Sequence, residues 1–357
     1  MRLINRKPVI FSVALLASAV MLAACSSSSN SGSTSSTAAA PKTQTSVTYL
    51  TDYLANGVYA PLFYGKKLGY FSKEGINLSV EYGSGSVTTA EALSSGKATM
   101  GDIYGGTLAE TDEQGGQLES VGFFRPDGGF AFFCAQNLHV HTIAQMKGMS
   151  VIIPPGTVQA ELYPGALKAG GLSVSSIKVL AVSGAIAGAD YAGGTGDCIA
   201  ETTNDAPVFA SRRPSTTILW TSAGFDAPGF AFVATKSFIA SHSSLVKDFL
   251  TAAYASIAAS LAHPGAAAAA FAAANPNIPV ASVDAQWKDS ESVFCTAEMT
   301  KANVDIGYQI PSVWSSGLQI LQKYQGLSSS LSPTSLYTNG FFTKDHVSTT
   351  TCGSVHS

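Results

Sequence analysis

Charged residues are scarce in this 357-residue chain. Asp, Glu, Lys and Arg make up 12% of it and the net charge is −3, whereas an ordinary globular protein carries about 25% of charged residues. No basic stripe interleaved with aromatic residues occurs, which argues against nucleic acid as a partner. The chain also lacks a Gly-x-x-x-x-Gly-Lys-Ser/Thr phosphate loop, a Cys-x-x-Cys pair and a Gly-x-Ser-x-Gly elbow. These absences argue against a nucleotide-hydrolysing subunit, a zinc or dithiol redox centre and an α/β-type hydrolase.

A short apolar stretch near the N-terminus predicts an export signal. It covers residues 9–21, follows a basic start at residues 2–7, and is shorter than the roughly 20 residues of a spanning helix. Leu22-Ala23-Ala24-Cys25 closes it and resembles a bacterial lipobox, in which the cysteine is acylated and becomes the new N-terminus. We therefore expect a signal peptide over residues 1–24 and a lipid on Cys25. An uncleaved anchor and an ordinary cleaved signal are the alternatives.

Residues 25–46 consist almost entirely of Ser, Thr, Ala, Gly and Asn. Such a segment cannot bury enough apolar surface to offset the entropy lost on ordering, so we expect a flexible, lipid-anchored linker. A polar linker after a lipidated cysteine places the rest of the chain on the outer face of the cytoplasmic membrane, on its extracellular or periplasmic side. It also makes the membrane a partner through the lipid.

From residue 47 the chain alternates strand-like and helix-like segments. This alternation predicts an α/β fold with helices on both faces of the sheets, and the roughly 310 residues that follow the linker suggest two lobes. We expect strands at 47–50, 76–82, 100–104, 150–153, 177–182, 197–200 and 216–220, and helices at 59–68, 88–95, 108–114, 158–168, 245–261, 266–274 and 313–324.

Two aromatic-rich strands, Gly128–Ala135 and Pro228–Thr235, resemble each other across roughly 100 residues. Two hinge strands that cross between two lobes would bracket a block of chain in this way. Coincidence is the alternative, since Phe-Ala-Phe is common in apolar strands. We expect residues 47–127 and 226–357 to form lobe 1, and residues 128–225 to form lobe 2.

Four cysteines follow Cys25 and, in an oxidising compartment, favour two disulfides over free buried thiols. Three pairings are possible. We prefer Cys134–Cys198 and Cys295–Cys352, because each bridge then stays inside one expected lobe.

Four sequence blocks carry a resemblance to a known family. Residues 60–76 combine an apolar run with Gly-Tyr-Phe and Lys-Glu-Gly steps, and residues 92–98, 144–151 and 196–198 follow in the same order. This series resembles the NMT1/THI5-like (SsuA/TauA-type) substrate-binding proteins of ABC importers. The resemblance implies a type II periplasmic-binding-protein fold, with two βα lobes joined by two hinge strands. It also implies a binding function without catalysis or cofactor, with a permease and an ATPase as partners of a monomer.

The sequence departs from the family pattern at two positions. Thr99 stands where the family usually has an aspartate, and Cys198 replaces an alanine. The cysteine-rich motif of the family's cytosolic pyrimidine synthase is absent, which again argues for a binding protein. His139 and His141 could share a strand face, but no further ligands for a metal lie nearby in the sequence.

Ligands of open α/β sheets bind beyond the carboxyl ends of the strands, so the loops there are the candidate site. Tyrosines can stack on a flat ligand, an amide can bond its edge, and Gly-Ser loops at helix starts offer free N–H groups. Ordinary turns, helix capping by Asn204 and a structural role for Arg125 are the alternatives. The candidates are Tyr53, Asn56, Tyr59, Ser84, Ser86 and Tyr104 in lobe 1, and Gly156, Thr157, Glu201 and Asn204 in lobe 2.

The resemblance leaves the ligand open, because the family binds thiamine-precursor pyrimidines, riboflavin-like rings, alkanesulfonates, taurine and nitrate. Tyr53, Tyr59 and Tyr104 favour a planar heterocycle such as a thiamine-precursor pyrimidine. A sulfonate or similar oxyanion is the alternative if Ser84, Ser86 and Thr157 dominate the site. An exported hydrolase and a structural lipoprotein are the remaining classes.

Overall fold

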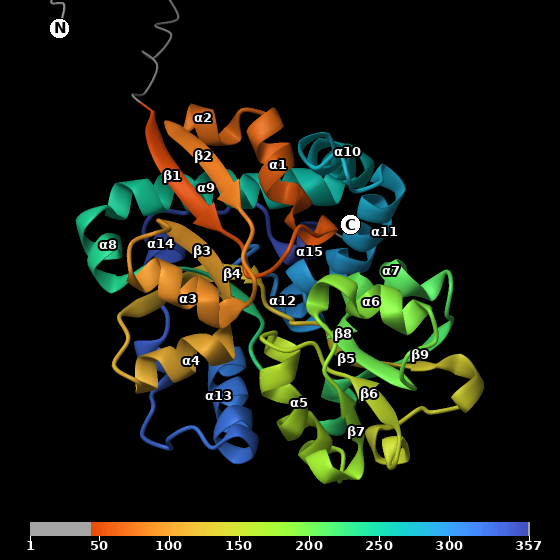
Figure 1. Cartoon of the computed structure of the whole chain (residues 1–357). Coiled ribbons are helices and arrows are strands. Elements are labelled where there is room, and N and C mark those ends of the chain that lie inside the picture. The colour runs from red at the N-terminus through yellow and green to blue at the C-terminus, as the bar shows by residue number, and fades with distance from the viewer. Residues whose placement is uncertain (1–43, 356–357) are drawn as a thin grey trace, which may run out of the picture. The chain divides into compact units, whose positions relative to one another are not determined.

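The computed structural model describes residues 44–355 (Figure 1). The expected signal peptide, Cys25 as the expected lipid-attachment residue, and nearly all of the expected linker lie outside the described residues. The first strand begins at Thr45, two residues earlier than the sequence pattern predicts.

The first sheet contains five strands in the order β2-β1-β3-β10-β4. Strand β1 runs parallel to β2 and β3, whereas β10 runs antiparallel to β3 and β4. We call this sheet and its helices lobe 1. Its strands are β1 (Thr45–Leu50), β2 (Ile76–Glu81), β3 (Met100–Tyr104), β4 (Leu118–Arg125) and β10 (Phe230–Thr235).

The second sheet repeats this arrangement in the order β7-β6-β8-β5-β9. Strand β6 is parallel to β7 and β8, and β5 is antiparallel to β8 and β9. We call this sheet and its helices lobe 2. Its strands are β5 (Phe130–Ala135), β6 (Ser150–Ile152), β7 (Lys178–Leu180), β8 (Cys198–Thr202) and β9 (Ser215–Leu219).

The chain crosses from one sheet to the other twice, before β5 and before β10. The predicted hinge strands therefore each belong to one sheet, and the crossings are the short segments 126–129 and 225–229 that precede them. These segments contact each other, since the Gly229 amide donates to the Pro126 carbonyl at 2.9 Å. Strands β5 and β10 are buried along almost their whole length, which explains why both have continuous apolar sequences.

Helices cover both sheets (Figure 1). In lobe 1 the long helix α9 meets the length and composition of a membrane span, yet Phe249, Leu250 and Ile257 are buried in the core beside Tyr49 and Phe232. α9 is therefore packed inside this lobe. The lobe 1 helices are α1 (Ala60–Lys67), α2 (Tyr70–Lys73), α3 (Ser86–Ser94), α4 (Gly105–Glu113), α8 (Lys236–Ser241), α9 (Ser243–Ala262), α10 (Pro264–Ala274), α11 (Val280–Phe294), α12 (Ala297–Ala302), α13 (Pro311–Gln325), α14 (Gly340–Thr343) and α15 (Cys352–Val355).

Lobe 2 has three α-helices in the described chain: α5 (Val158–Ala169), α6 (Gly184–Ala192) and α7 (Ala206–Ala210). An aromatic cluster continues from this lobe into lobe 1. The Phe130 ring lies 5.4 Å from Trp220 and 6.0 Å from Phe230, between ring centroids. Large aromatic side chains therefore pack against one another next to the two crossing segments.

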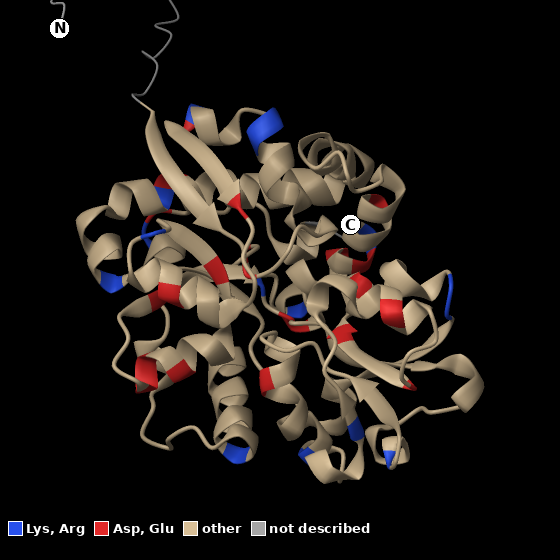
Figure 2. Cartoon of the chain, viewed as in Figure 1, with Lys and Arg blue, Asp and Glu red and all other residues tan. Residues whose placement is uncertain are grey.

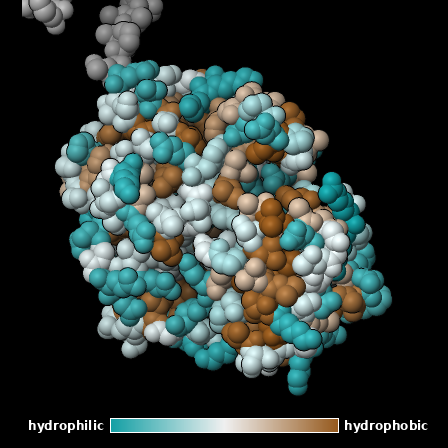
Figure 3. Space-filling model, viewed as in Figure 1, coloured by the Kyte–Doolittle hydropathy of each residue, from teal (hydrophilic) through white to brown (hydrophobic). Residues whose placement is uncertain are grey.

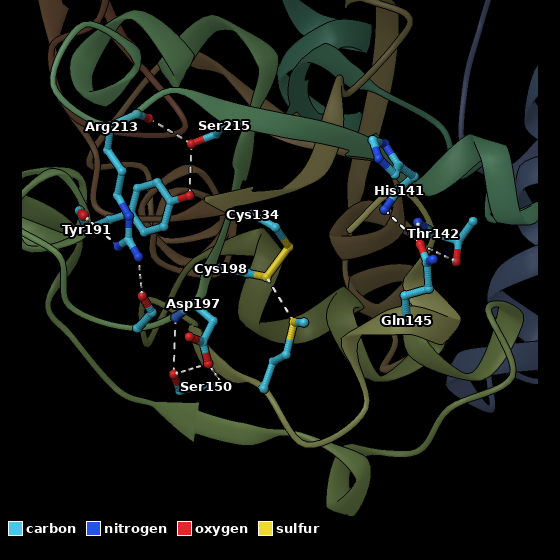
Figure 4. Close-up of a disulfide and its surroundings, with 12 residues drawn as sticks. Cys134, His141, Thr142, Gln145, Ser150, Tyr191, Asp197, Cys198, Arg213 and Ser215 are labelled. Atoms are coloured by element: carbon cyan, nitrogen blue, oxygen red, sulfur yellow. Dashed lines mark hydrogen bonds between the residues drawn. A yellow bond between two sulfur atoms is a disulfide. The ribbon is translucent and has the colours of Figure 1, made fainter. Parts of the chain in front are cut away.

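Two disulfides stabilise the lobes, and both have the preferred pairing. Cys134 and Cys198 are opposite each other on β5 and β8. Figure 4 shows this bridge close to Asp197, which accepts hydrogen bonds from the Ser150 amide at 2.8 Å and the Ser150 hydroxyl at 2.7 Å. The second bridge joins Cys295, just after α11, to Cys352 at the start of α15.

Candidate functional site

A chamber lies between the carboxyl ends of the two sheets. We call it the inner chamber. In this closed arrangement its free volume is about 30 Å³, which is room for one or two water molecules, so a ring ligand enters only when the lobes open further. Lobe 1 contributes Asp52, Tyr53, Asn56, Val58, Tyr59, Gly85, Arg125 and Phe230, and lobe 2 contributes Thr157, Val158, Gln159, Thr202, Asn204 and Asp205.

Five of the predicted site residues line the inner chamber: Tyr53, Asn56, Tyr59, Thr157 and Asn204. They lie there because each follows a strand whose carboxyl end points at the cleft. Thr157 also begins α5, where its side-chain oxygen accepts from the Ala160 amide at 3.2 Å. Its hydroxyl donates to the Pro154 carbonyl at 2.7 Å, so its hydrogen-bonding capacity is largely used within its own loop.

The other predicted residues lie outside this lining. Ser84 is exposed and pairs with Thr88. Ser86 is buried beneath the chamber. Tyr104 is buried at the crossings, with its ring 5.5 Å from Phe130 between centroids. Glu201 lines a neighbouring cavity, described below.

Tyr59 does not offer a face to a ligand. Its ring stacks on Phe124 with 5.9 Å between centroids, and its hydroxyl oxygen accepts from the Tyr53 amide at 3.2 Å. Tyr59 therefore fixes the position of the first loop. Tyr53, which is only partly buried, is the tyrosine of that loop with an available surface.

Direct hydrogen bonds join the two lobes across the inner chamber. The Asn56 amide nitrogen donates to Asp205 at 2.5 Å, and the Asn204 amide nitrogen donates to the Asn56 side-chain oxygen at 3.2 Å. The Arg125 guanidinium reaches the Asn204 oxygen at 3.5 Å. The structure is therefore a closed arrangement of the lobes.

Gly85 and Gly156 allow the lobe backbones to meet. A Cβ atom on Gly85 would overlap the carbonyl oxygen of Gly156, and Gly85 has a φ of 142°. A residue with a side chain would therefore be strained and would push the lobes apart. Gly156 was predicted to bind the ligand, and its backbone carbonyl instead lies against Gly85 of lobe 1.

Two buried carboxylates underlie the lobe 1 wall. Asp102 accepts from the Tyr49 hydroxyl at 2.7 Å and the Asp52 amide at 3.2 Å. Ser86 donates its hydroxyl to Asp52 and accepts from the Tyr104 amide at 2.9 Å. Burial raises the pKa of Asp52 to about 6, and burial together with the Asp52 charge raises the pKa of Asp102 to about 7. The pair therefore takes up protons near neutral pH.

Two further carboxylates lie on lobe 2. Burial, and then repulsion by Asp205, raise the pKa of Glu201 well above its usual range. Burial also raises the pKa of Asp205, an effect that hydrogen bonds from Thr202 and Asn56 and the Arg125 charge oppose. The Thr202 hydroxyl lies 2.5 Å from Asp205. Lobe 2 therefore faces the cleft with Asp205, which accepts hydrogen bonds from Thr202 and Asn56, and with Glu201, whose raised pKa favours the protonated, hydrogen-bond-donating carboxyl.

Arg125 is the one basic side chain that lines the inner chamber in the described chain. Its guanidinium carbon lies 3.6 Å from the centroid of the Phe230 ring, and its Nε has no hydrogen-bond partner among the described residues. In Figure 2 most basic segments lie at the periphery of the view, whereas acidic segments also lie near its centre. The chamber thus has more acidic acceptors than cationic donors, which suits a ligand with N–H or O–H donors or positive charge.

Several lining residues were not predicted from the sequence: Asp52, Gln159, Thr202, Asp205 and Phe230. Asp52 directly precedes the predicted residue Tyr53, and Asp205 directly follows the predicted residue Asn204. The strand-end rule could therefore have identified both aspartates. Groups of three or more His, Cys, Asp or Glu side chains placed to hold a metal do not occur among residues 44–355.

Residues 56–267 match the sequence family described as NMT1/THI5 like. The chain belongs to this family. The riboflavin-binding protein RibY of Chloroflexus aurantiacus is 22% identical over 311 residues, which span 85% of this chain and 87% of RibY.

Solved structures share the fold at low sequence identity. The alkanesulfonate-binding protein SsuA of Xanthomonas axonopodis pv. citri, bound to MOPS, has a TM-score of 0.61 and 15% identity, over 84% of this chain and 99% of SsuA. The nitrate-binding protein NrtA of Synechocystis has a TM-score of 0.65 and 16% identity, over 85% of this chain and 89% of NrtA. The expected two-lobed periplasmic-binding fold is confirmed.

Proposed function

We propose that this chain is an extracytoplasmic solute-binding protein that captures a planar, nitrogen-bearing ring compound, neutral or positively charged, for an ABC importer. The observation that carries this proposal is the acceptor-rich chamber, with Asp52 and Asp205 in its lining. A ring N–H or amine can donate to these carboxylates, whereas an anion placed between them would be repelled. The riboflavin-binding relative agrees with a ring ligand.

An oxyanion is the second candidate, and Arg125 favours it. Its Nε has no hydrogen-bond partner among the described residues, and a guanidinium suits sulfonate or nitrate. Two structural neighbours are named for such anions. The chamber nevertheless makes a weak anion site. Its lining has one guanidinium and two carboxyl groups, those of Asp52 and Asp205. Arg125 also already contacts the Phe230 ring and the Asn204 side chain.

Ligand capture couples to lobe closure in this proposal. Residues 128–225 move against residues 47–127 and 226–357 about the paired crossings 126–129 and 225–229. A ligand that contacts both lobes favours the closed arrangement, and a permease recognises that arrangement. The ligand is released unchanged, so the protein performs no catalysis.

A ligand panel tests the proposal. Hydroxymethylpyrimidine, riboflavin, taurine, an alkanesulfonate and nitrate would each be titrated into the purified protein by calorimetry, with recovery of the ligand checked by chromatography. We expect binding of a ring compound, and at 100 times its dissociation constant it should raise the free energy of unfolding by about 2.7 kcal/mol. Heat from the anions alone would overturn the ring ligand, and conversion of a ligand into product would overturn the binding function.

A lipid anchor on Cys25 is proposed from the lipobox alone, because this residue lies outside the described part of the chain. Cys25→Ser removes the acylated thiol, so we expect the variant to leave the membrane fraction on cell fractionation. Ser26→Ala is the matched control, since it changes a neighbouring residue and leaves the thiol intact. If the Cys25→Ser protein stayed with the membrane as fully as the wild type, the lipoprotein assignment would be wrong.

A further inference from the structure

A second cavity adjoins the inner chamber and has a volume of about 200 Å³. We call it the outer chamber. Three residues, Tyr53, Asn56 and Asp205, line both chambers, so the two share a wall. The remaining lining residues are Leu54, Ala55 and Gln286 of lobe 1, and Gly184, Ala185, Gly188, Glu201, Val208 and Phe209 of lobe 2.

One wall of the outer chamber is the start of α6, where the residues are unusually small. Gly184, Ala185 and Gly188 all line it. A Cβ atom on Gly184 would overlap the Tyr53 hydroxyl, so the Tyr53 ring of lobe 1 reaches the backbone of α6. Tyr53 therefore covers Gly184, and the Val208 side chain lies against Gly188, so the exposed Ala185 is the residue of this wall that leaves open surface on α6.

Two exposed apolar side chains also line the outer chamber. Leu54 is 39% exposed and Val208 is 50% exposed. Figure 3 shows hydrophobic surface on the part of lobe 2 that faces lobe 1. A polar solute confined to the inner chamber would leave these side chains in water, whereas an apolar group in the outer chamber would cover them.

Polar residues lie in the wall that the two chambers share. The Asn56 amide there donates to Asp205 at 2.5 Å, and Glu201 also lines the outer chamber. The Gln286 side chain is already used, because its oxygen accepts from the Gly57 amide at 3.0 Å. A ligand that passed this wall would meet a carboxylate and an amide oxygen, which are both acceptors.

We propose that the ligand occupies both chambers and is therefore longer than a single ring. Its polar, donor-bearing part lies in the inner chamber between Asp52 and Asp205. Its flat apolar part lies in the outer chamber against α6, and an O–H or N–H group between the two parts replaces the Asn56 amide as donor to Asp205. This inference rests on the proposed function and specifies its substrate class as an amphipathic, extended ring compound.

The test fills the outer chamber without altering the inner one. Ala185 lines the outer chamber and is exposed, so Ala185→Phe can be accommodated by the fold while it takes up ligand space. Ile186→Phe is the matched control, because Ile186 is on the same helix, is 52% exposed and lines neither chamber. Riboflavin serves as the long probe and hydroxymethylpyrimidine as the short one, with dissociation constants measured by calorimetry.

We expect Ala185→Phe to weaken riboflavin binding by at least about tenfold and to change binding of the short probe by less than about twofold. Ile186→Phe should change neither. Three results would overturn the inference: no riboflavin binding beside good binding of the short probe, equal losses for both probes, or unchanged riboflavin affinity in Ala185→Phe. If the wild type bound only taurine, alkanesulfonate or nitrate, the proposed function itself would fail and the inference with it.

Discussion

Asp205→Asn is expected to weaken binding of a ring ligand by about 10- to 100-fold. Asp205 lines both chambers and contacts Asn56 across the cleft. The substitution keeps the shape of the side chain and removes its charge. A hydrogen bond to a charged group contributes about 1.5–3 kcal/mol, which corresponds to this range of affinity.

The direction of the effect identifies the kind of ligand. A donor-bearing or cationic ligand loses an acceptor in the Asp205→Asn variant, whereas an oxyanion is freed from a nearby negative charge and should bind more tightly. Asp197→Asn is the matched control, because Asp197 also lies in lobe 2 but bonds Ser150 and lines neither chamber. Unchanged affinity in Asp205→Asn, with a ring ligand bound, would place the ligand elsewhere.

The same carboxylates make ligand binding and protein stability respond to pH in opposite directions. Burial raises the pKa of Asp52 to about 6 and the pKa of Asp205 above its usual range. As the pH falls through about 6, Asp52 takes up a proton and loses its charge, and the raised pKa of Asp205 acts in the same direction. Affinity for a donor-bearing ligand should then fall, by up to about tenfold per pH unit for each proton that binding must displace.

Stability of the unliganded protein should change the other way. Asp52 and Asp102 have pKa values of about 6 and about 7 in the folded protein, above the ordinary aspartate pKa of 3.8. Between these values and about 3.8 the folded state binds more protons than the unfolded state, so stability rises as the pH falls through this window. Thermal unfolding from pH 8 to pH 5 measures this, and Asp102→Asn should flatten the profile.

The strand-end rule predicts, from sequence, residues that line the inner chamber, but the environment of each residue depends on burial. The rule placed Tyr53, Asn56 and Asn204 around the chamber, as the structure has them. It also assigned ligand stacking to Tyr59, whose ring is instead covered by Phe124. Whether an aromatic ring faces a ligand or a neighbouring side chain depends on tertiary packing, which a single sequence does not reveal.

The elements that sequence patterns missed have local reasons. Strand β4 contains Gly122, and glycine inside a strand normally argues against one. Here the glycine makes room for the Tyr254 hydroxyl, which donates to the Phe123 carbonyl at 3.1 Å. Helix α6 contains Gly184 and Gly188, which lower helix propensity, and these same glycines form the wall of the outer chamber. By contrast, α11 has an apolar helical repeat after Pro279 and could have been predicted.

Loss of either disulfide is expected to lower the free energy of unfolding by about 4 kcal/mol. The bridges close loops with sequence separations of 64 and 57 residues, and cross-links of this span remove a corresponding amount of entropy from the unfolded chain. Cys134→Ala/Cys198→Ala and Cys295→Ala/Cys352→Ala would be compared with the wild type by urea unfolding. The paired alanines avoid leaving a lone thiol or a buried hydroxyl.

The two variants should differ in where the structure loosens. Cys134 and Cys198 lie on hydrogen-bonded strands of one sheet, so the ladder between β5 and β8 still holds them together. The C-terminal segment has fewer supports, among them the Cys352 amide bond to the Val304 carbonyl at 2.9 Å and the Ile306 amide bond to the Thr350 carbonyl at 2.9 Å. We therefore expect amide exchange at residues 344–355 to rise sharply only in the Cys295→Ala/Cys352→Ala variant. Equal protection of this segment in both variants would show that the second bridge does not hold the C-terminal segment in place.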